Sequence, residues 1–358
     1  MPHHVYGAVD IGGTKIAAGL VDADGELLQR VELPTPARGP AEEVVATVVK
    51  LIDALAEDPR WGRVTGVGIG SAGPVDPARG TVSPVNIPAW RDFPLVEQVA
   101  ALPAVGERSL PVKLLGDASA MAAGEHWRGA ARGYDDALCL VVSTGVGAGL
   151  ILDGVLRTGP SGNAGHLGHI SVDVEGEDCP CGSRGCVEVI ASGTAIARWA
   201  VQHGWRADAS AAASPLGSAS AAAHTDNVVV PGGGEGGEGG AAAASGLAVA
   251  TGPAPAPATA ADIAAAARQG DEIALAAFER AGRALAAGIA AAATLADVRV
   301  AVVGGGVAKA GPVLFDPLRR HLARYCSLPF TRDLEVLPAT LGGDAGLIGA
   351  ASVLAAAR

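Results

Sequence analysis

The sequence predicts an α/β fold built from two similar halves, each beginning with a β-hairpin. A glycine-rich turn between two apolar strands occurs at residues 10–15, and a similar turn follows at residues 143–147. A strand, a glycine turn and a second strand are typical of a hairpin. After each hairpin, helical periodicity alternates with short apolar strands, as in α/β domains. The length of 358 residues suits two domains or one large duplicated unit.

The first half is predicted to begin with three consecutive strands, with a turn at Asp24 and Gly25 between the second and the third. The other boundaries follow from the change between alternating and 3.6-residue periodicity. The expected strands are residues 5–9, 15–21, 27–33, 64–70 and 112–115, and the expected helices are residues 41–57 and 118–128.

The second half repeats the hairpin and ends in Ala-rich helices. The expected strands are residues 137–142, 148–152 and 298–303, and helical patterns cover residues 261–295 and 347–357. Residues 207–258 differ, because Ala, Ser, Gly and Pro dominate there and Lys and Arg are absent. Such a segment buries too little apolar surface to offset its ordering entropy. We therefore expect a flexible low-complexity insert that is dispensable for chemistry.

Composition and charge exclude several classes of function. The formal net charge is −11, which argues against a nucleic-acid partner. No apolar run reaches the ~18 residues of a membrane span, and the N-terminus lacks the pattern of a signal peptide. We expect a cytoplasmic protein with no nucleic-acid or membrane partner. Five cysteines, an odd number, argue against a disulfide scaffold there.

The two glycine turns have the composition of phosphate-binding loops. Residues 10–15 read DIGGTK; adjacent glycines let backbone N–H groups approach phosphate oxygens, and the Thr14 hydroxyl adds a donor. Asp10, at the strand end, can hold Mg²⁺ through water. A plain hairpin turn is the alternative, but the second turn, STGVG at residues 143–147, favours phosphate binding. Residues 304–306, three glycines after a strand, add a third surface for close approach.

One histidine and three cysteines have the spacing of a metal site. His169, Cys179, Cys181 and Cys186 form the pattern H-x₉-C-x-C-x₄-C. Three thiolates and one imidazole complete a tetrahedral zinc site with no open position, so the zinc is predicted to be structural. It would hold the loop of residues 161–188 in place.

Asp117 follows an apolar strand and precedes a predicted helix. A carboxylate in this position can cap the helix N-terminus. It can equally act as a base in a crevice at the strand end. The local sequence favours the capping role of Asp117, whereas the expected phosphate-binding turns favour its role as a base.

These motifs, in this order, resemble the ROK family of sugar kinases and regulators. The resemblance extends over nearly the whole chain except residues 207–258, and it implies an actin/hexokinase-like (ribonuclease H-like) fold with two α/β domains around a cleft. The first domain would comprise residues 1–128 joined by the C-terminal helix 345–358. The second would comprise residues 129–344, with the zinc loop and the insert. Family members transfer the γ-phosphate of ATP to a sugar hydroxyl, usually at C6 for hexoses.

The resemblance also implies a role for each motif residue. Asp117 matches the catalytic base, which accepts the proton of the sugar hydroxyl as its oxygen attacks in line. ATP and Mg²⁺ are the implied cofactors, beside the structural Zn²⁺. The implied sugar contacts are Asn86, Gly116, Asp117, His166, His169 and Glu188. The implied nucleotide contacts are Asp10, Gly12, Gly13, Thr14, Lys15, Thr144, Gly145, Gly305 and Gly306.

Two departures from the family pattern bear on the sugar. The family usually has Asn before the catalytic Asp, where this chain has Gly116. Its glucokinase-like members usually have Glu at the first position of the motif that ends in His169, where this chain has His166. A neutral imidazole has one donor and one acceptor, and its N–H could meet an acyl carbonyl. A His at this position resembles the bacterial N-acetylmannosamine kinases of the family.

The favoured interpretation is therefore an ATP-dependent kinase of an N-acylhexosamine or hexose, with N-acetylmannosamine preferred. A glucokinase is the alternative enzyme. A catalytically weak sugar-sensing protein is the alternative of another class; Gly116 motivates it and Asp117 argues against it. The expected phosphate loop begins at Asp10, so we expect no helix-turn-helix region like that of ROK repressors. The resemblance also makes a homodimer an expectation.

Overall fold

The computed structural model describes residues 4–207 and 257–356. The described residues up to 205 and from 259 onward form one compact unit. Almost all of the predicted insert therefore lies outside the described residues. Within the described part, no helix has the length and apolarity needed to cross a membrane.

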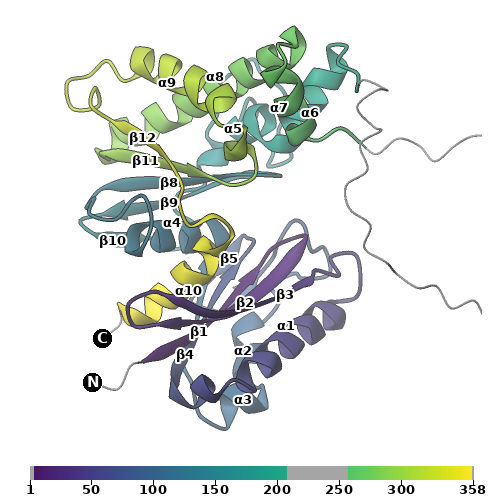
Figure 1. The fold of residues 1–358 in the computed structure, drawn as a ribbon, viewed down its shortest axis with the longest axis vertical. Coiled ribbons are helices and arrows are strands. Elements are labelled where there is room, and N and C mark those ends of the chain that lie inside the picture. The colour runs from purple at the N-terminus through teal and green to yellow at the C-terminus, as the bar shows by residue number, and fades with distance from the viewer. Residues whose placement is uncertain (1–3, 208–256, 357–358) are drawn as a thin grey trace, which may run out of the picture. The chain divides into compact units, whose positions relative to one another are not determined.

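The first sheet has five strands in the order β3-β2-β1-β4-β7 (Figure 1). The first three strands are antiparallel, and β1 pairs with β4 and β4 with β7 in parallel. A two-stranded ribbon follows β4 in the chain. The bounds are β1 (Val5–Ile11), β2 (Lys15–Asp22), β3 (Leu27–Pro34), β4 (Val64–Ser71), β7 (Val112–Gly116), and β5 (Val75–Asp76) with β6 (Thr81–Val82) in the ribbon.

The second sheet repeats this topology strand for strand, in the order β10-β9-β8-β11-β12. Again three antiparallel strands are followed by two parallel pairings. The duplication expected from the two glycine turns is thus confirmed. The bounds are β8 (Ala137–Val142), β9 (Val146–Leu152), β10 (Val155–Arg157), β11 (Val300–Gly304) and β12 (Glu335–Pro338).

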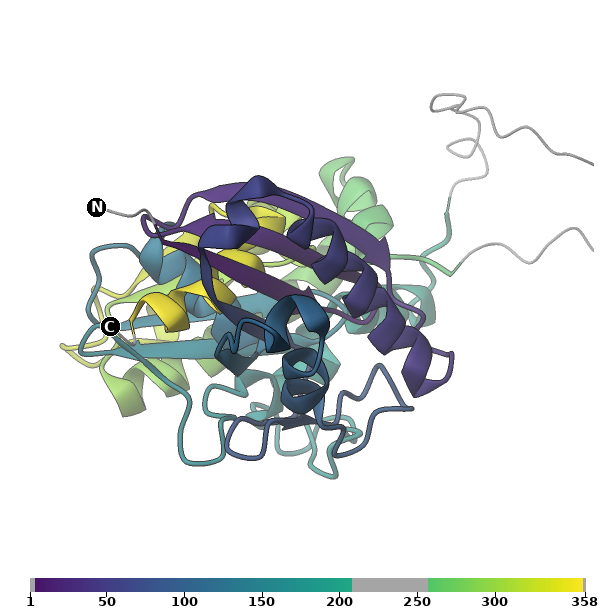
Figure 2. The same ribbon diagram turned by 90° about the horizontal axis from the view of Figure 1, so that it is seen from below.

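Helices cover both faces of the first sheet (Figures 1 and 2). Successive side chains of a strand point to opposite faces. Val5 and Val9 of β1 accordingly lie in the core with α1 (Ala41–Ala56), whereas Tyr6 and Ala8 pack against α10 (Ala345–Ala355). Burial on both faces explains why the central strands β1 and β4 are largely apolar.

Helices α4 (Asp117–Trp127) and α10 lie between the two sheets and cross at close range (Figure 1). A Cβ atom on Gly349 would overlap the carbonyl oxygen of Ala120, so the two backbones touch at this position. The fully buried Glu125 of α4 fixes the crossing, because its carboxylate accepts the backbone N–H groups of Thr340 and Leu341 just before α10. The end of the chain is thereby joined to the helix that begins at Asp117.

Several of the remaining helices were not predicted from the sequence, and one predicted helix is broken in two. Figure 1 shows most of those from the second half on the face of the second sheet away from α4. The helical pattern expected over 261–295 is two helices, because Gly270 has a φ of +90° and Asp271 caps a new helix by accepting the N–H of Ala274. The bounds are α2 (Leu95–Ala100), α3 (Pro103–Gly106), α5 (Val187–Ala191), α6 (Gly193–Gln202), α7 (Ala260–Arg268), α8 (Glu272–Ala296) and α9 (Pro312–Tyr325).

Candidate active site and metal cluster

The first glycine turn joins β1 to β2 and presents exposed polar groups. Its hairpin is closed by a hydrogen bond from the Gly12 N–H to the Lys15 carbonyl (3.0 Å). Thr14 and Lys15 are exposed at the tip. The side chain of Asn86 lies directly against Gly13, where any Cβ would overlap it. The structure therefore brings Asn86 to the first turn, beside the groups expected to hold phosphate.

Asp10, at the end of β1, has a partly buried carboxylate whose negative charge is only partly offset by nearby cationic groups. Burial, followed by the charge of Asp117, raises its pKa to about 7, against the lowering influence of Lys15 and Arg30. The charge of Asp117 thus disfavours the ionised form of Asp10. A buried carboxylate with unsatisfied charge fits a water-mediated Mg²⁺ site, because this ion keeps several waters in protein sites.

Asp117 begins α4, one residue earlier than the sequence predicted, with Gly116 as the capping residue. Its Oδ1 accepts the N–H of Ala118 (2.7 Å). The side chain reaches solvent, yet protein atoms crowd it on most sides. This desolvation raises the pKa of Asp117, while the Ala118 N–H and the nearby His166 lower it. A solvent-reachable carboxylate with a raised pKa can accept a proton from a substrate hydroxyl.

The second glycine turn is held by a carboxylate from outside the hairpin. Glu188, on α5, accepts the N–H of Val146 at its Oε2 (2.8 Å). The same oxygen lies so close to Gly145 that a Cβ there would meet it. Thr144 is exposed at the tip, and its carbonyl accepts the hydroxyl of Thr194 (3.0 Å). Glu188 was expected to contact sugar; in the structure its Oε2 positions the second turn.

The triple-glycine segment after β11 approaches the same turn. Gly305 has a φ of +89°, and a Cβ there would overlap the carbonyl oxygen of Val142. Gly306 faces the hydroxyl of Ser143, and both glycines are exposed. The second sheet thus brings two exposed glycine segments together, as expected for a surface that binds nucleotide.

His169, Cys179, Cys181 and Cys186 converge on one point, with all their ligand atoms within 4.8 Å of one another. The Cys181 and Cys186 sulfurs are 3.8 Å apart, and the Cys179 sulfur is 3.7 Å from Nδ1 of His169. Ligands ~2.3 Å (S) or ~2.1 Å (N) from a tetrahedral zinc would be separated by about 3.8 Å and about 3.6 Å. The donor set and its spacing therefore fit zinc.

Burial raises the pKa of the Cys179 thiol to about 12 and also raises that of Cys186. Hydrogen bonding, led by the N–H of Ser183, lowers the pKa of Cys181. Thiols ligate zinc as thiolates, so metal binding would release protons from this cluster. Since Nδ1 of His169 faces the cysteines, its Nε2 points away from them.

His166 lies one turn before His169 and within electrostatic range of Asp117. Its Nδ1 is 2.7 Å from the backbone carbonyl of Asn163. A carbonyl only accepts, so Nδ1 carries the hydrogen, and in the neutral ring the free Nε2 is an acceptor. This corrects the sequence-based expectation that the imidazole N–H would meet an acyl carbonyl, because that N–H is already in use.

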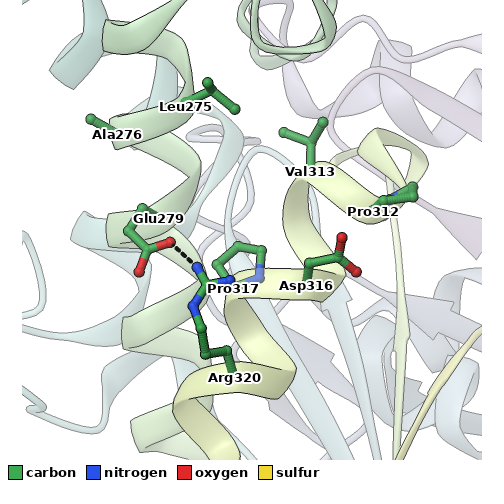
Figure 3. A pocket seen from close by; sticks show the side chains of 8 residues that line it. All are labelled: Leu275, Ala276, Glu279, Pro312, Val313, Asp316, Pro317 and Arg320. Atoms are coloured by element: carbon green, nitrogen blue, oxygen red, sulfur yellow. Dashed lines mark hydrogen bonds and ion pairs between the residues drawn. The ribbon is translucent and has the colours of Figure 1, made fainter. Parts of the chain in front are cut away.

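A pocket of about 530 Å³ lies apart from these residues, between α8 and α9 (Figure 3). Leu275, Pro312 and Val313 give it an apolar lining, and Glu279 pairs with Arg320 across its edge (2.5 Å). None of the predicted site residues lines it. We assign no substrate to this pocket.

A model of the ROK family matches residues 6–357 of the chain. The chain belongs to the ROK family. It is 33% identical to the glucokinase of Thermotoga maritima, over 99% of this chain and 98% of the relative. It is 36% identical to the glucokinase of Streptomyces coelicolor, over 96% of both. An N-acetylmannosamine kinase of Escherichia fergusonii is 41% identical, but over only 53% of this chain and 62% of the relative.

Solved structures agree with this assignment. A ROK family glucokinase from Streptomyces griseus, in complex with glucose and AMPPNP, superposes with a TM-score of 0.71 at 34% identity and covers 98% of both chains. The ROK hexokinase from Thermus thermophilus gives a TM-score of 0.73 at 31% identity, covering 97% of this chain and 96% of the other. The actin/hexokinase-like fold is confirmed, and the chain stands among the sugar kinases of its family.

Two features of the site escaped the sequence analysis. Lys15 pairs with Glu32 (3.1 Å) on the neighbouring strand, so the lysine beside the first turn is partnered. Asn163 connects the loop before the cysteines to Val75. A signal existed for Asn163, since an asparagine between turn glycines often makes specific backbone hydrogen bonds, but its partner 88 residues away could not be inferred.

Proposed function

We propose that this ROK-family chain transfers the γ-phosphate of ATP to the C6 hydroxyl of an N-acylhexosamine, with N-acetylmannosamine as the preferred substrate. The observation that carries the proposal is the position of Asp117. It begins α4 at the end of the first sheet, beside Asp10 and within electrostatic range of His166. The proposed base is thus within electrostatic range both of a phosphate-side carboxylate and of a sugar-side ring.

In the proposed reaction, Asp117 accepts the proton of the sugar hydroxyl as the hydroxyl oxygen attacks the γ-phosphorus, while the bond from that phosphorus to the β–γ bridging oxygen breaks and ADP leaves. A carboxylate with a raised pKa suits this role, because its proton affinity is closer to that of the group it deprotonates. The exposed turns at Gly12–Thr14 and Thr144–Gly145 would donate backbone N–H groups to the phosphates, and Gly305 and Gly306 would flank the adenosine. Mg²⁺ held near Asp10 would neutralise charge on the phosphates.

His166 supports the choice of an N-acylhexosamine as the sugar. Its Nδ1–H is bound to the Asn163 carbonyl, so Nε2 can accept a hydrogen bond. The acetamido group of an N-acylhexosamine offers an N–H to such an acceptor. His169 would contribute its Nε2 and Glu188 its second carboxylate oxygen, while Asn86 lies at the first turn. The partial match to N-acetylmannosamine kinases supports the same choice.

A glucokinase is the second candidate, because the relatives that match over the full length carry that name. A weakly active sugar sensor is the third, motivated by Gly116. The division into two domains, at residues 1–128 with 345–358 and at residues 129–344, is part of the same proposal, as is a homodimer.

A sugar panel with coupled detection of ADP tests the proposal. N-acetylmannosamine should give the highest kcat/KM, with glucose and N-acetylglucosamine lower, and Asp117→Asn is the control for activity from contaminants. A clear preference for glucose would select the second candidate. Sugar binding by calorimetry with no ADP release from any sugar would select the third.

A further inference from the structure

Asn163 makes a two-sided connection between the sugar-side loop and the chain that leaves the first sheet. Its Oδ1 accepts the N–H of Val75 (3.1 Å), and its Nδ2 donates to the carbonyl of Val75 (2.8 Å). One amide side chain therefore pairs with both backbone groups of a buried residue, as a neighbouring β-strand would. Nδ2 also donates to the Ser161 carbonyl within the loop (2.8 Å). Every polar atom of this side chain is in use.

The backbone of Asn163 holds His166. Its carbonyl accepts the Nδ1–H of His166 (2.7 Å), which fixes both the ring orientation and the tautomer. On either side of Asn163, a glycine leaves no room for a Cβ atom. Gly162, with a φ of +82°, lies against the ring of Pro77, and Gly165, with a φ of +93°, lies against the Ala148 carbonyl. The loop is thus held from two directions around Asn163.

Val75, the partner of Asn163, also adjoins the catalytic side. A Cβ built on Gly116, the residue before Asp117, would come within ordinary van der Waals range of the Val75 side chain. Hydrogen bonds run from Val75 through Asn163 to His166, and Val75 adjoins Gly116 at the other end. The Asn163 side chain thus ties the loop that carries His166 to the segment next to Asp117, and its loss would leave the position of His166 relative to Asp117 less fixed.

We propose that Asn163 is a positioning residue that sets the placement and tautomer of His166 relative to Asp117, and thereby the selection of the sugar. This inference rests on the proposed function for its kinetic consequences. Its structural consequence, the tautomer of the His166 ring, can be measured without any substrate. Asn163 acts through His166, so its effect should depend on the presence of that ring.

The kinetic test is a double-mutant cycle of Asn163→Ala and His166→Ala, which isolates the coupling of the two residues. Asn163→Ala should raise the KM for the sugar about tenfold, leave the KM for ATP within about twofold, and leave the zinc content at one per chain. In the His166→Ala background the same change should alter the sugar KM by less than about twofold. Asn163→Asp, which loses both donated hydrogen bonds, should behave like Asn163→Ala and serves if the alanine variant does not fold.

The matched control is Ser171→Ala, which removes a hydrogen bond to the Arg184 carbonyl (2.7 Å) elsewhere in the same loop. It should leave the sugar KM unchanged. An equal rise in sugar KM for Ser171→Ala, or equal effects of Asn163→Ala with and without His166, would mean that Asn163 only stabilises the loop, and the proposal would be wrong.

Nitrogen NMR of the histidine rings separates this inference from the proposed function. The ring of His166 should be hydrogenated at Nδ1 in the unmodified protein and should populate both tautomers in Asn163→Ala. If this change of tautomer is observed but the enzyme phosphorylates no sugar, the proposed function is contradicted and the role of Asn163 is supported. An unchanged tautomer in a folded Asn163→Ala variant would overturn that role whatever the activity.

Discussion

The carboxylate of Glu188 and the backbone N–H of Val146 are joined by a 2.8 Å hydrogen bond. Glu188 lies two residues after Cys186, the last member of the metal cluster, and Val146 lies in the second glycine turn. The metal cluster is therefore mechanically connected to a turn that is proposed to bind phosphate. This connection gives the zinc a consequence beyond the stability of its own loop.

Removing the zinc should weaken nucleotide binding as well as sugar binding. Without metal, the loop that carries Glu188 loses its anchor, and the Val146 N–H loses a fixed partner. We expect one zinc per chain by elemental analysis, a lower Tm after chelation, and higher Kd values for sugar and ATP. Cys326→Ala is the control, because this thiol lies outside the cluster. Fresh, thiol-protected protein without zinc would contradict the assignment.

Asp117→Asn should lower kcat by ~10²–10⁴-fold, the usual contribution of general-base catalysis. The ATP affinity should stay nearly unchanged, because the substitution keeps the shape and the oxygen that accepts the Ala118 N–H. Since only the ionised carboxylate is a base, kcat/KM of the unmodified enzyme should fall as the pH drops through the raised pKa of Asp117. A pH–rate profile measures this limb, and activity at the original level in the variant would exclude Asp117 as the base.

Asp10→Asn should make the protein more stable at alkaline pH while abolishing efficient turnover. The folded-state pKa of Asp10 is raised from 3.8 to about 7, so the folded state holds this proton more tightly than the unfolded state. The stabilisation that binding this proton gives the folded state is complete below the unfolded-state pKa of 3.8. It is lost as the pH rises through the folded-state pKa of about 7. The gain in unfolding free energy of the variant should thus grow between pH 5 and pH 8, by at most about 3 kcal/mol.

Thermal unfolding without added divalent metal checks this prediction at both pH values. Asp24→Asn, in the exposed turn between β2 and β3, is the control and should show no such trend. If the stability difference between Asp10→Asn and the unmodified protein is the same at pH 5 and pH 8, burial does not raise the pKa of Asp10.

His166→Glu should raise kcat/KM for glucose relative to N-acetylmannosamine. A carboxylate can accept hydrogen bonds from two sugar hydroxyls, and one added charge-assisted bond corresponds to about 10–150-fold in that ratio. His166→Gln separates charge from shape, because it has the size of Glu without the charge, and it should give a much smaller change. If the ratio measured on both sugars does not move, His166 does not determine the sugar.

Gly116→Asn should improve sugar binding. A Cβ on Gly116 would meet only ordinary contacts, to Val75 and Ser119, and the backbone there has an unstrained φ of −66°. The space therefore admits a side chain, and one regained hydrogen bond would lower the sugar KM by about 2–12-fold. Gly116→Ala is the matched control and should not lower it. An unchanged KM for Gly116→Asn, in a folded variant, would mean that no sugar hydroxyl lies within its reach.

Local chemistry in the sequence determined the elements and the motifs. Turn glycines, strand alternation and helical period are properties of neighbouring residues, so the hairpins at DIGGTK and STGVG and the duplicated topology could be predicted. The cluster of His169 with Cys179, Cys181 and Cys186 was equally accessible, because metal ligands in one loop have a recognisable spacing. The break of the long helical pattern at Gly270 was missed, although it too is local.

Only the tertiary structure decided what these motifs do to one another. The raised pKa of Asp10 depends on burial and on Asp117, which lies 107 residues further along the chain. The hydrogen bond that fixes the tautomer of His166 and the pairing of Asn163 with Val75 depend on two distant segments meeting at hydrogen-bond distance. Burial, charge and hydrogen bonding act through space over a few ångströms, and such proximity between distant residues is set by the packing of the whole chain.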